Sequence, residues 1–181
     1  MMKKLSILVV VALLAISCNS DTPFLINDSQ IGPILKTTTV GELETLFIND
    51  SVINKNSSNP IKKAKTSITV FEKGGKKLMS ILPTEAGSES AIKNVKIYDE
   101  RYKTDRGIGL SSTFKDLSSK YTIKRIDNLI DVVVVFVEES NAYFTIDKKH
   151  LAGELMFNTR AKIEKTQIPD NTPIKYFMIE W

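Results

Sequence analysis

The chain has 181 residues, of which 42% are hydrophobic and 25% charged, a composition typical of a globular protein that can bury one core. Its single cysteine and single histidine exclude a disulfide framework, a zinc site built from Cys and His, and any mechanism that needs two histidines. The formal net charge is +4.

The first residues predict an export signal. Two lysines precede an apolar run over residues 5–16, which is interrupted only by Ser6. At about 1.5 Å per residue, a helix of this length falls short of a hydrocarbon core of about 30 Å. We therefore expect residues 1–17 to be a cleaved signal peptide rather than a permanent membrane span.

Cys18 directly follows Ala15-Ile16-Ser17. This segment resembles the lipobox of bacterial lipoproteins, in which the cysteine thiol receives a diacylglyceryl group and becomes the first residue after cleavage. The alternative is an ordinary secretory signal in which a cysteine falls there by chance. We expect acylation, including palmitate, at Cys18, because the only cysteine of the chain lies at this position. Two or three acyl chains would then anchor the protein stably.

The residues after Cys18 predict a tether, a folded domain and the membrane in which the protein is anchored. Residues 18–25 are short and mostly polar, as expected of a lipidated tether, and residues 26–181 are expected to form a single domain. In Gram-negative lipoproteins an Asp after the cysteine often favours the inner membrane, whereas this chain has Asn19. The resemblance therefore implies the outer membrane, on its periplasmic face.

The first half of the domain predicts one helix and three strands. Leu43, Leu46 and Phe47 have helical spacing after a capping Thr38 or Thr39. Residues 49–60 are polar and are expected to form a loop. Residues 66–72 and 77–82 flank a Lys-Gly-Gly-Lys turn and predict a hairpin, and residues 92–102 predict a third strand.

The second half repeats this order. A short helix is expected within residues 111–120, followed by strands at 121–126, 131–138, 142–146 and 174–181. Ile31-Gly32 aligns with Ile108-Gly109, and Val70-Phe71-Glu72 aligns with Phe136-Val137-Glu138. Neither half can bury its apolar face alone, so the halves should share one core. The predicted class is α+β: mainly antiparallel sheet with two short helices and an internal pseudo-repeat of helix, hairpin and strand.

Several of these segments resemble a known family. The similarity runs from residue 26 to about 150 and is carried by Ile31-Gly32-Pro33, Leu43, Leu46-Phe47, residues 67–71 and 78–82, and Gly107-Ile108-Gly109 with Phe114. The chain is similar in these segments to the small sigma-E-regulated bacterial lipoproteins that carry a domain of unknown function. The resemblance implies an envelope protein with no assigned chemistry. The lysine- and asparagine-rich composition is also similar to that of Bacteroidota lipoproteins.

The residues that could carry chemistry do not form a set. Residues 106–112 lie between a predicted strand and helix, where backbone N–H groups could hold a phosphate. The third glycine of a dinucleotide fingerprint is missing, so a plain turn is favoured. His150 has no acid at a fixed offset, and the pairs Asp99-Glu100 and Glu138-Glu139 alternate across their strands. We expect no catalytic residue, no metal and no cofactor.

Basic charge is concentrated in residues 51–77, where seven lysines accompany a single acidic residue, Glu72. The candidate site for an anionic partner, meaning a lipid headgroup, a glycan or an acidic protein, consists of Lys62, Lys63, Lys65, Lys73, Lys76 and Lys77. The alternative is a solvated loop and hairpin tip. We expect no nucleic-acid partner, because the predicted anchor separates the protein from the genome.

These patterns favour a non-enzymatic binding or scaffolding module held at the outer membrane by its lipid. The alternative is a periplasmic immunity or inhibitor lipoprotein that binds a toxin or hydrolase, for which a small domain with segregated charge would serve. A hydrolase of cell-wall glycan or peptide is a third class, and it would need carboxylates from distant segments.

The anchor can be tested by changing Cys18→Ala. Because only the thiol can be alkylated, the variant should accumulate as an uncleaved or soluble precursor, measured by fractionation and by the mass of the N-terminal peptide. A variant that is still cleaved before residue 18 and fully membrane-bound would contradict lipidation at this cysteine.

Overall fold

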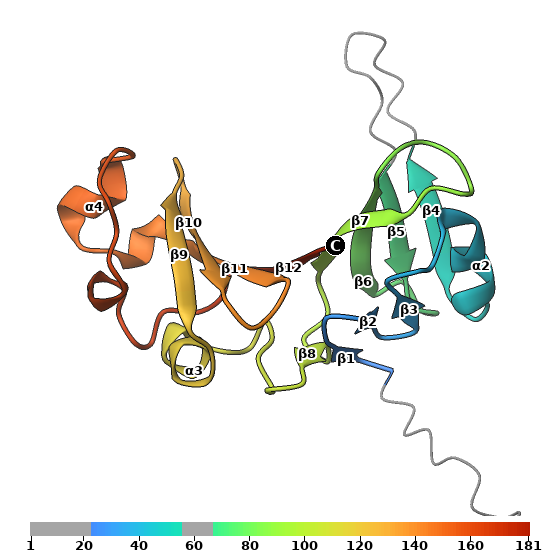
Figure 1. Ribbon diagram of the computed structural model, residues 1–181, viewed down its shortest axis with the longest axis horizontal. Helices are drawn as coiled ribbons and strands as arrows, with labels where there is room; N and C mark the ends of the chain where they lie inside the picture. The colour runs from blue at the N-terminus through green and yellow to red at the C-terminus, as the bar shows by residue number, and fades with distance from the viewer. Residues whose placement is uncertain (1–22, 56–66) are drawn as a thin grey trace, which may run out of the picture.

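The computed structural model describes residues 23–55 and 67–181 (Figure 1). The predicted signal peptide, Cys18, Lys62, Lys63 and Lys65 lie outside these residues. An eight-stranded antiparallel sheet has the order β4-β5-β6-β7-β12-β11-β10-β9, and a four-stranded sheet has the order β3-β2-β1-β8. With its few short helices, the protein has the predicted α+β class.

The first half begins with a capped helix. The Glu42 carboxylate accepts a hydrogen bond of 2.7 Å from the Thr39 N–H, which satisfies a backbone donor at the helix start. The elements of this half are η1 (Val40–Glu42), α2 (Leu43–Leu46), β4 (Ser51–Lys55), β5 (Ser67–Phe71), β6 (Lys77–Pro83) and β7 (Ile92–Ile97). The expected loop at 49–60 is wrong over β4. Its sequence, Ser-Val-Ile-Asn-Lys, lacks the alternation of a half-buried strand, and among the described strands it pairs only with β5.

The second half has the same order. Thr113 and Asp116 form the capping box of its helix, with the Asp116 carboxylate 2.8 Å from the Thr113 N. The elements are α3 (Phe114–Lys120), β9 (Ile123–Asn128), β10 (Val132–Val137), β11 (Ala142–Asp147) and β12 (Tyr176–Glu180). Between β11 and β12 the chain makes an excursion that the sequence did not predict, with η2 (Lys148–His150), α4 (Gly153–Phe157) and η3 (Lys165–Gln167).

The helices of the two halves are held by equivalent contacts. The N–H of Val40 donates to the carbonyl of Ser90 at 3.0 Å, and that of Phe114 donates to Thr172 at 2.8 Å. Each helix buries one leucine completely, Leu43 or Leu117. Four residues later each chain places an aromatic ring in the core, Phe47 or Tyr121. The predicted pseudo-repeat is therefore present in the backbone contacts as well as in the element order.

The two repeats join where β7 pairs with β12, in the middle of the eight-stranded sheet (Figure 1). Phe177 is opposite Ile97 and Ile179 is opposite Val95, so the pair of Lys96 and Met178 marks an approximate two-fold axis. The last strand of each repeat thus closes the sheet for the other repeat.

The alignment expected from sequence is displaced by one residue in the hairpins. Val70 and Val137 both belong to the core, whereas Phe136 lies on the opposite face of β10 and stacks on Tyr143. Register shifts occur beside Val70 in one repeat and beside Val137 in the other. The extra residues are Leu78 in β6 and Lys124 in β9, so the two bulges lie in partner strands and at different strand pairs of the two repeats.

A single hydrophobic cluster includes residues from both repeats, among them Val70, Ile97, Phe144 and Phe177. The small sheet, made of β1 (Leu25–Ile26), β2 (Gln30–Ile31), β3 (Ile34–Leu35) and β8 (Lys103–Thr104), also contributes to this cluster. β1 pairs in parallel with β8, which follows the first repeat. β1 is thereby attached to the segment that links the two repeats.

The shared core predicts that a substitution in β12 destabilises both repeats. Phe177→Ala should lower the free energy of unfolding by about 3–5 kcal/mol, because the side chain is fully buried and stacks on Phe144 at 5.0 Å. Met178→Ala, on the half-buried opposite face, should cost clearly less. Urea unfolding gives both midpoints. Loss of hydrogen-exchange protection in only one repeat would contradict a shared core.

Candidate binding site

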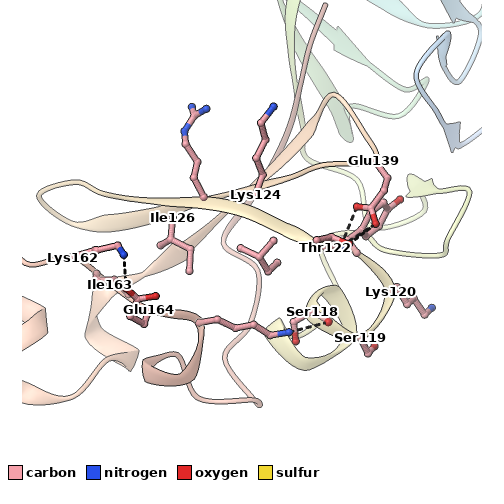
Figure 2. A pocket seen from close by; sticks show the side chains of 14 residues that line it. Ser118, Ser119, Lys120, Thr122, Lys124, Ile126, Glu139, Lys162, Ile163 and Glu164 are labelled. Carbon is pink, nitrogen blue, oxygen red and sulfur yellow. Dashed lines mark hydrogen bonds and ion pairs between the residues drawn. The ribbon is translucent and has the colours of Figure 1, made fainter.

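A hollow of about 730 Å³ lies between α3, β9 and residues 162–165 of the excursion (Figure 2). Its floor includes Ile123, Ile126 and Ile163, which all belong to or pack against the core. Its rim carries side chains from the end of α3, from β9 and from the excursion. The hollow therefore combines an apolar floor with a polar rim, as small binding sites commonly do.

A bulge in β9 decides which side chains face the hollow. Arg125 is opposite Phe136 and Ile123 is opposite Val137, so Lys124 is the extra residue. The bulge allows Ile123 and Ile126, three positions apart, to point to the same side. Figure 2 shows Ile126 directed towards the excursion and Lys124 directed away from it. The Arg125 guanidinium lies 3.6 Å from the centre of the Phe136 ring, on the outer face of β10.

Side-chain hydrogen bonds hold the excursion beside β9. Asn128 Nδ2 donates to the carbonyls of Asn158 and Ala161, both at 2.8 Å. The ammonium of Lys148, which is 1% exposed, donates to the carbonyl of Leu129 at 3.2 Å. At the other end, Lys165 Nζ donates to the carbonyl of Ser118 on α3 at 3.3 Å. The excursion, which forms one wall of the hollow, is thus hydrogen-bonded both to the end of β9 and to α3.

Glu139 closes the end of the hollow next to α3. Its carboxylate accepts hydrogen bonds from the Thr122 hydroxyl at 2.8 Å and from the Thr122 N–H at 3.0 Å (Figure 2). The hydroxyl bond is the main cause that lowers the pKa of Glu139, and the guanidinium of Arg106 adds to it. Glu139 is therefore an ionised structural group.

The rim has an excess of basic charge. Two acidic residues, Glu139 and Glu164, and five basic residues line the hollow: Lys120, Lys124, Arg125, Lys162 and Lys165. Of these, Lys124 and Arg125 direct their side chains to the outer face of the sheet. Lys162 pairs with Glu164 at 2.7 Å. The sequence did not predict this group, because its members come from two distant segments, residues 120–125 and 162–165, and form no charged run.

The first repeat contains an equivalent hollow of about 450 Å³, between η1, β4 and residues 83–88. Val52 lies where the second repeat has Ile123, and Glu44 lies where it has Ser118. Among the described residues that line this hollow, none is a lysine or an arginine. Within residues 23–55 and 67–181, the basic rim therefore belongs to one of the two hollows.

The predicted lysine patch has three described members, Lys73, Lys76 and Lys77. Lys73 is exposed in the β5–β6 turn. Lys76 pairs with the carboxylate of Asp99 at 3.1 Å, and the Lys77 ammonium lies 3.7 Å from the centre of the Tyr98 ring. Two of the three thus have partners within the fold, and an anionic partner for this patch stays a prediction.

Asp99 is the buried centre of an ion cluster whose other members are partly exposed. Arg101 donates to its fully buried carboxylate through Nη2 at 2.7 Å, through Nε and through the backbone N–H. Burial alone would raise the pKa of Asp99, but the hydrogen bonds from Arg101 and Lys76 lower it to about 2. Arg101 also pairs with Glu72 at 2.8 Å and covers the ring of Phe24 at 4.2 Å. The cluster joins the β5–β6 turn to the link after β7.

The Gly107-Ile108-Gly109 segment is a turn that packs against β8. A Cβ on Gly109 would lie 2.6 Å from the Tyr102 carbonyl oxygen, so only glycine fits there. The N–H of Ile108 donates to Thr104 Oγ1 and that of Gly109 donates to Ser112 Oγ. Since these amides already have partners, the geometry supports the turn interpretation over phosphate binding.

The other candidates for chemistry lie apart. Asp99 and Glu139 are bound by different partners in different repeats, and Glu100 and Glu138 are exposed. His150 ends η2 in the excursion. Within residues 23–55 and 67–181, no three His, Cys, Asp or Glu side chains are close enough to hold a metal ion. In the same ranges no helix has the length and hydropathy needed to cross a membrane.

Comparison with known proteins identifies a similar fold. The sequence matches no protein-family model and no curated protein. Among solved structures, the chain is similar to the crystal structure of the uncharacterized protein yfeY from Escherichia coli, at 14% identity and a TM-score of 0.60. The similarity covers 86% of this chain and 99% of that chain. At this identity it shows the fold alone.

The Asp99 cluster predicts a defined dependence of stability on pH. Because the pKa of Asp99 is lower in the folded chain, its contribution is present above pH 4 and lost as the pH falls towards 2. Asp99→Asn should reduce the free energy of unfolding near pH 7 by about 2 kcal/mol. The difference from the unaltered chain should vanish near pH 2. Glu100→Gln, at the exposed neighbour, is the control. A constant difference from pH 7 to pH 2 would contradict the assignment.

Proposed function

We propose that the protein is a lipid-anchored envelope protein that acts as a non-enzymatic binding module at the periplasmic face of the outer membrane. The hollow between α3 and β9 holds its anionic partner. The observation that carries this proposal is the difference between the two equivalent hollows. Five basic residues line the larger one, whereas the described residues that line the smaller one include none. A duplicated scaffold that carries charge at only one of two matching positions indicates a ligand at that position.

The anchor expected at Cys18 fits this role. Cys18 precedes Phe24 by six residues, so even a fully extended tether spans roughly 20 Å. Phe24 packs edge-to-face on Tyr102 at 5.1 Å and is covered by Arg101, which fixes it to the body of the protein. A lipid on Cys18 would therefore hold the small sheet close to the membrane. The resemblance to sigma-E-regulated lipoproteins supports the same location in the cell envelope.

The test compares two sets of lysines. Lys124, Lys162 and Lys165 are changed to Gln in one variant, and the control variant changes the exposed Lys36, Lys93 and Lys115. The full-length protein in detergent is titrated with phosphatidylglycerol vesicles, lipopolysaccharide and polyglutamate at low and physiological salt. At least one probe should bind the first variant about tenfold more weakly, since each exposed ion pair contributes up to about 1 kcal/mol. The control should change by less than about twofold.

Two results would contradict the proposal: no binding of any of the three probes by the unaltered chain, or equal losses in the two variants. A third variant, with Gln at all six lysines of the predicted patch, separates the two sites. If it alone loses binding, the partner binds at the lysine patch instead of the hollow.

A further inference from the structure

The hollow lies along an open strand edge. In the part of the chain that the structure describes, β9 is the last strand of the eight-stranded sheet and pairs only with β10. Five successive residues, from Thr122 to Ile126, line the hollow. Successive side chains of a strand point to opposite faces, so five in a row line one space only if the backbone edge borders it. The hollow is therefore a groove beside unpaired backbone groups.

The register identifies the backbone groups that face this groove. The N–H of Leu129 donates to the carbonyl of Val132 at 2.9 Å, which makes these two residues a hydrogen-bonded pair. In an antiparallel ladder such pairs alternate with pairs whose N–H and C=O groups point away from each other. Ile126, three residues before Leu129 and opposite Val135, belongs to the second kind. Its N–H and C=O are thus directed towards the open edge.

We propose that an extended, acidic segment of a partner protein adds to β9 as an antiparallel strand in this groove. This inference rests on the proposed function and identifies its anionic partner as a peptide. Main-chain hydrogen bonds to an exposed edge supply affinity in such complexes, and alternate side chains supply specificity.

The side chains of β9 predict the pattern of the partner. Paired residues of adjacent strands lie on the same face, so residues opposite Ile123 and Ile126 point to the apolar floor of the groove. Their neighbours point to the face that carries Lys124 and Arg125. The partner should therefore alternate apolar, preferably β-branched, residues with carboxylates.

The same charges oppose other strands. A second copy of β9 would bring two sets of Lys124 and Arg125 together, and like charges opposite each other destabilise a strand pair. On the other edge of the sheet, β4 borders a hollow whose described lining contains Glu44 and no basic side chain. β9 thus offers an acidic strand more basic partners than the described lining beside β4 does.

The probe that tests this is a fluorescein-labelled decapeptide of alternating Glu and Val, titrated into the full-length protein in detergent and followed by fluorescence anisotropy. Lys124→Glu should weaken binding at least about tenfold, because it replaces an attractive charge with a repulsive one. The matched control is Ile53→Glu, at the equivalent position of β4, where the side chain is 44% exposed. It should change binding by less than about twofold. Urea midpoints confirm that both variants fold.

Two N-methylated peptides test the pairing itself. In an antiparallel strand, residues opposite Ile126 share its face and bond with its N–H and C=O, so the valines of the probe supply these bonds. Methylation of the valine nitrogens should abolish binding, while methylation of the glutamate nitrogens should leave it. The Ile126 amide should also exchange more slowly in the complex.

Equal binding of the two methylated peptides, or unchanged exchange at Ile126, would overturn strand addition. If vesicles or lipopolysaccharide bind through the rim lysines and the peptide does not, the partner is a lipid or glycan and only this inference fails. If none of the anionic probes binds, the proposed function itself fails.

Discussion

The pairing of β7 with β12 is the contact on which the rest of the structure depends. Each repeat is a helix and a four-stranded meander, and alone it would leave the last strand as an unpaired edge. The two final strands pair instead around Lys96 and Met178, and their buried faces enter one core through Ile97 and Phe177. Since β7 ends the first repeat and β12 ends the second, the eight-stranded sheet forms only when both repeats are present.

This symmetry explains why the two hollows correspond. In each repeat the helix packs beside the first strand of the meander, and the connection that precedes the last strand crosses nearby. The first repeat makes this connection with a short loop, whereas the second inserts residues 148–175. The insertion adds a wall, fixed by Asn128 and Lys148, and with it Lys162 and Lys165. The larger, basic groove is thus a consequence of one long connection in an otherwise repeated scaffold.

Charge serves two different purposes in the two repeats. In the first, Lys76 and Arg101 neutralise the buried Asp99, so their charges stabilise the turn of a hairpin. In the second, Lys124 and Arg125 lie on an edge strand with its open side next to a groove. A bulge places both on one face and two isoleucines on the other. Edge strands commonly carry such charges to prevent self-association, and here the same charges define which strand would fit.

The sequence by itself determined what depends on local pattern. Helical spacing after Thr38 or Thr39 and within residues 111–120, the Lys-Gly-Gly-Lys turn and the order of the repeated elements could all be predicted, because caps, turns and apolar periodicity act within a few residues. Tertiary structure alone decided the rest. β4 was not predicted because its stability comes from pairing with β5 rather than from its own residue pattern.

The run of lysines in residues 51–77 suggested one basic surface, but Lys76 pairs with Asp99 and Lys77 lies over the ring of Tyr98. The basic rim, by contrast, joins Lys120, Lys124 and Lys165 across distant segments. Charges make a site through distances in space, which chain order does not specify.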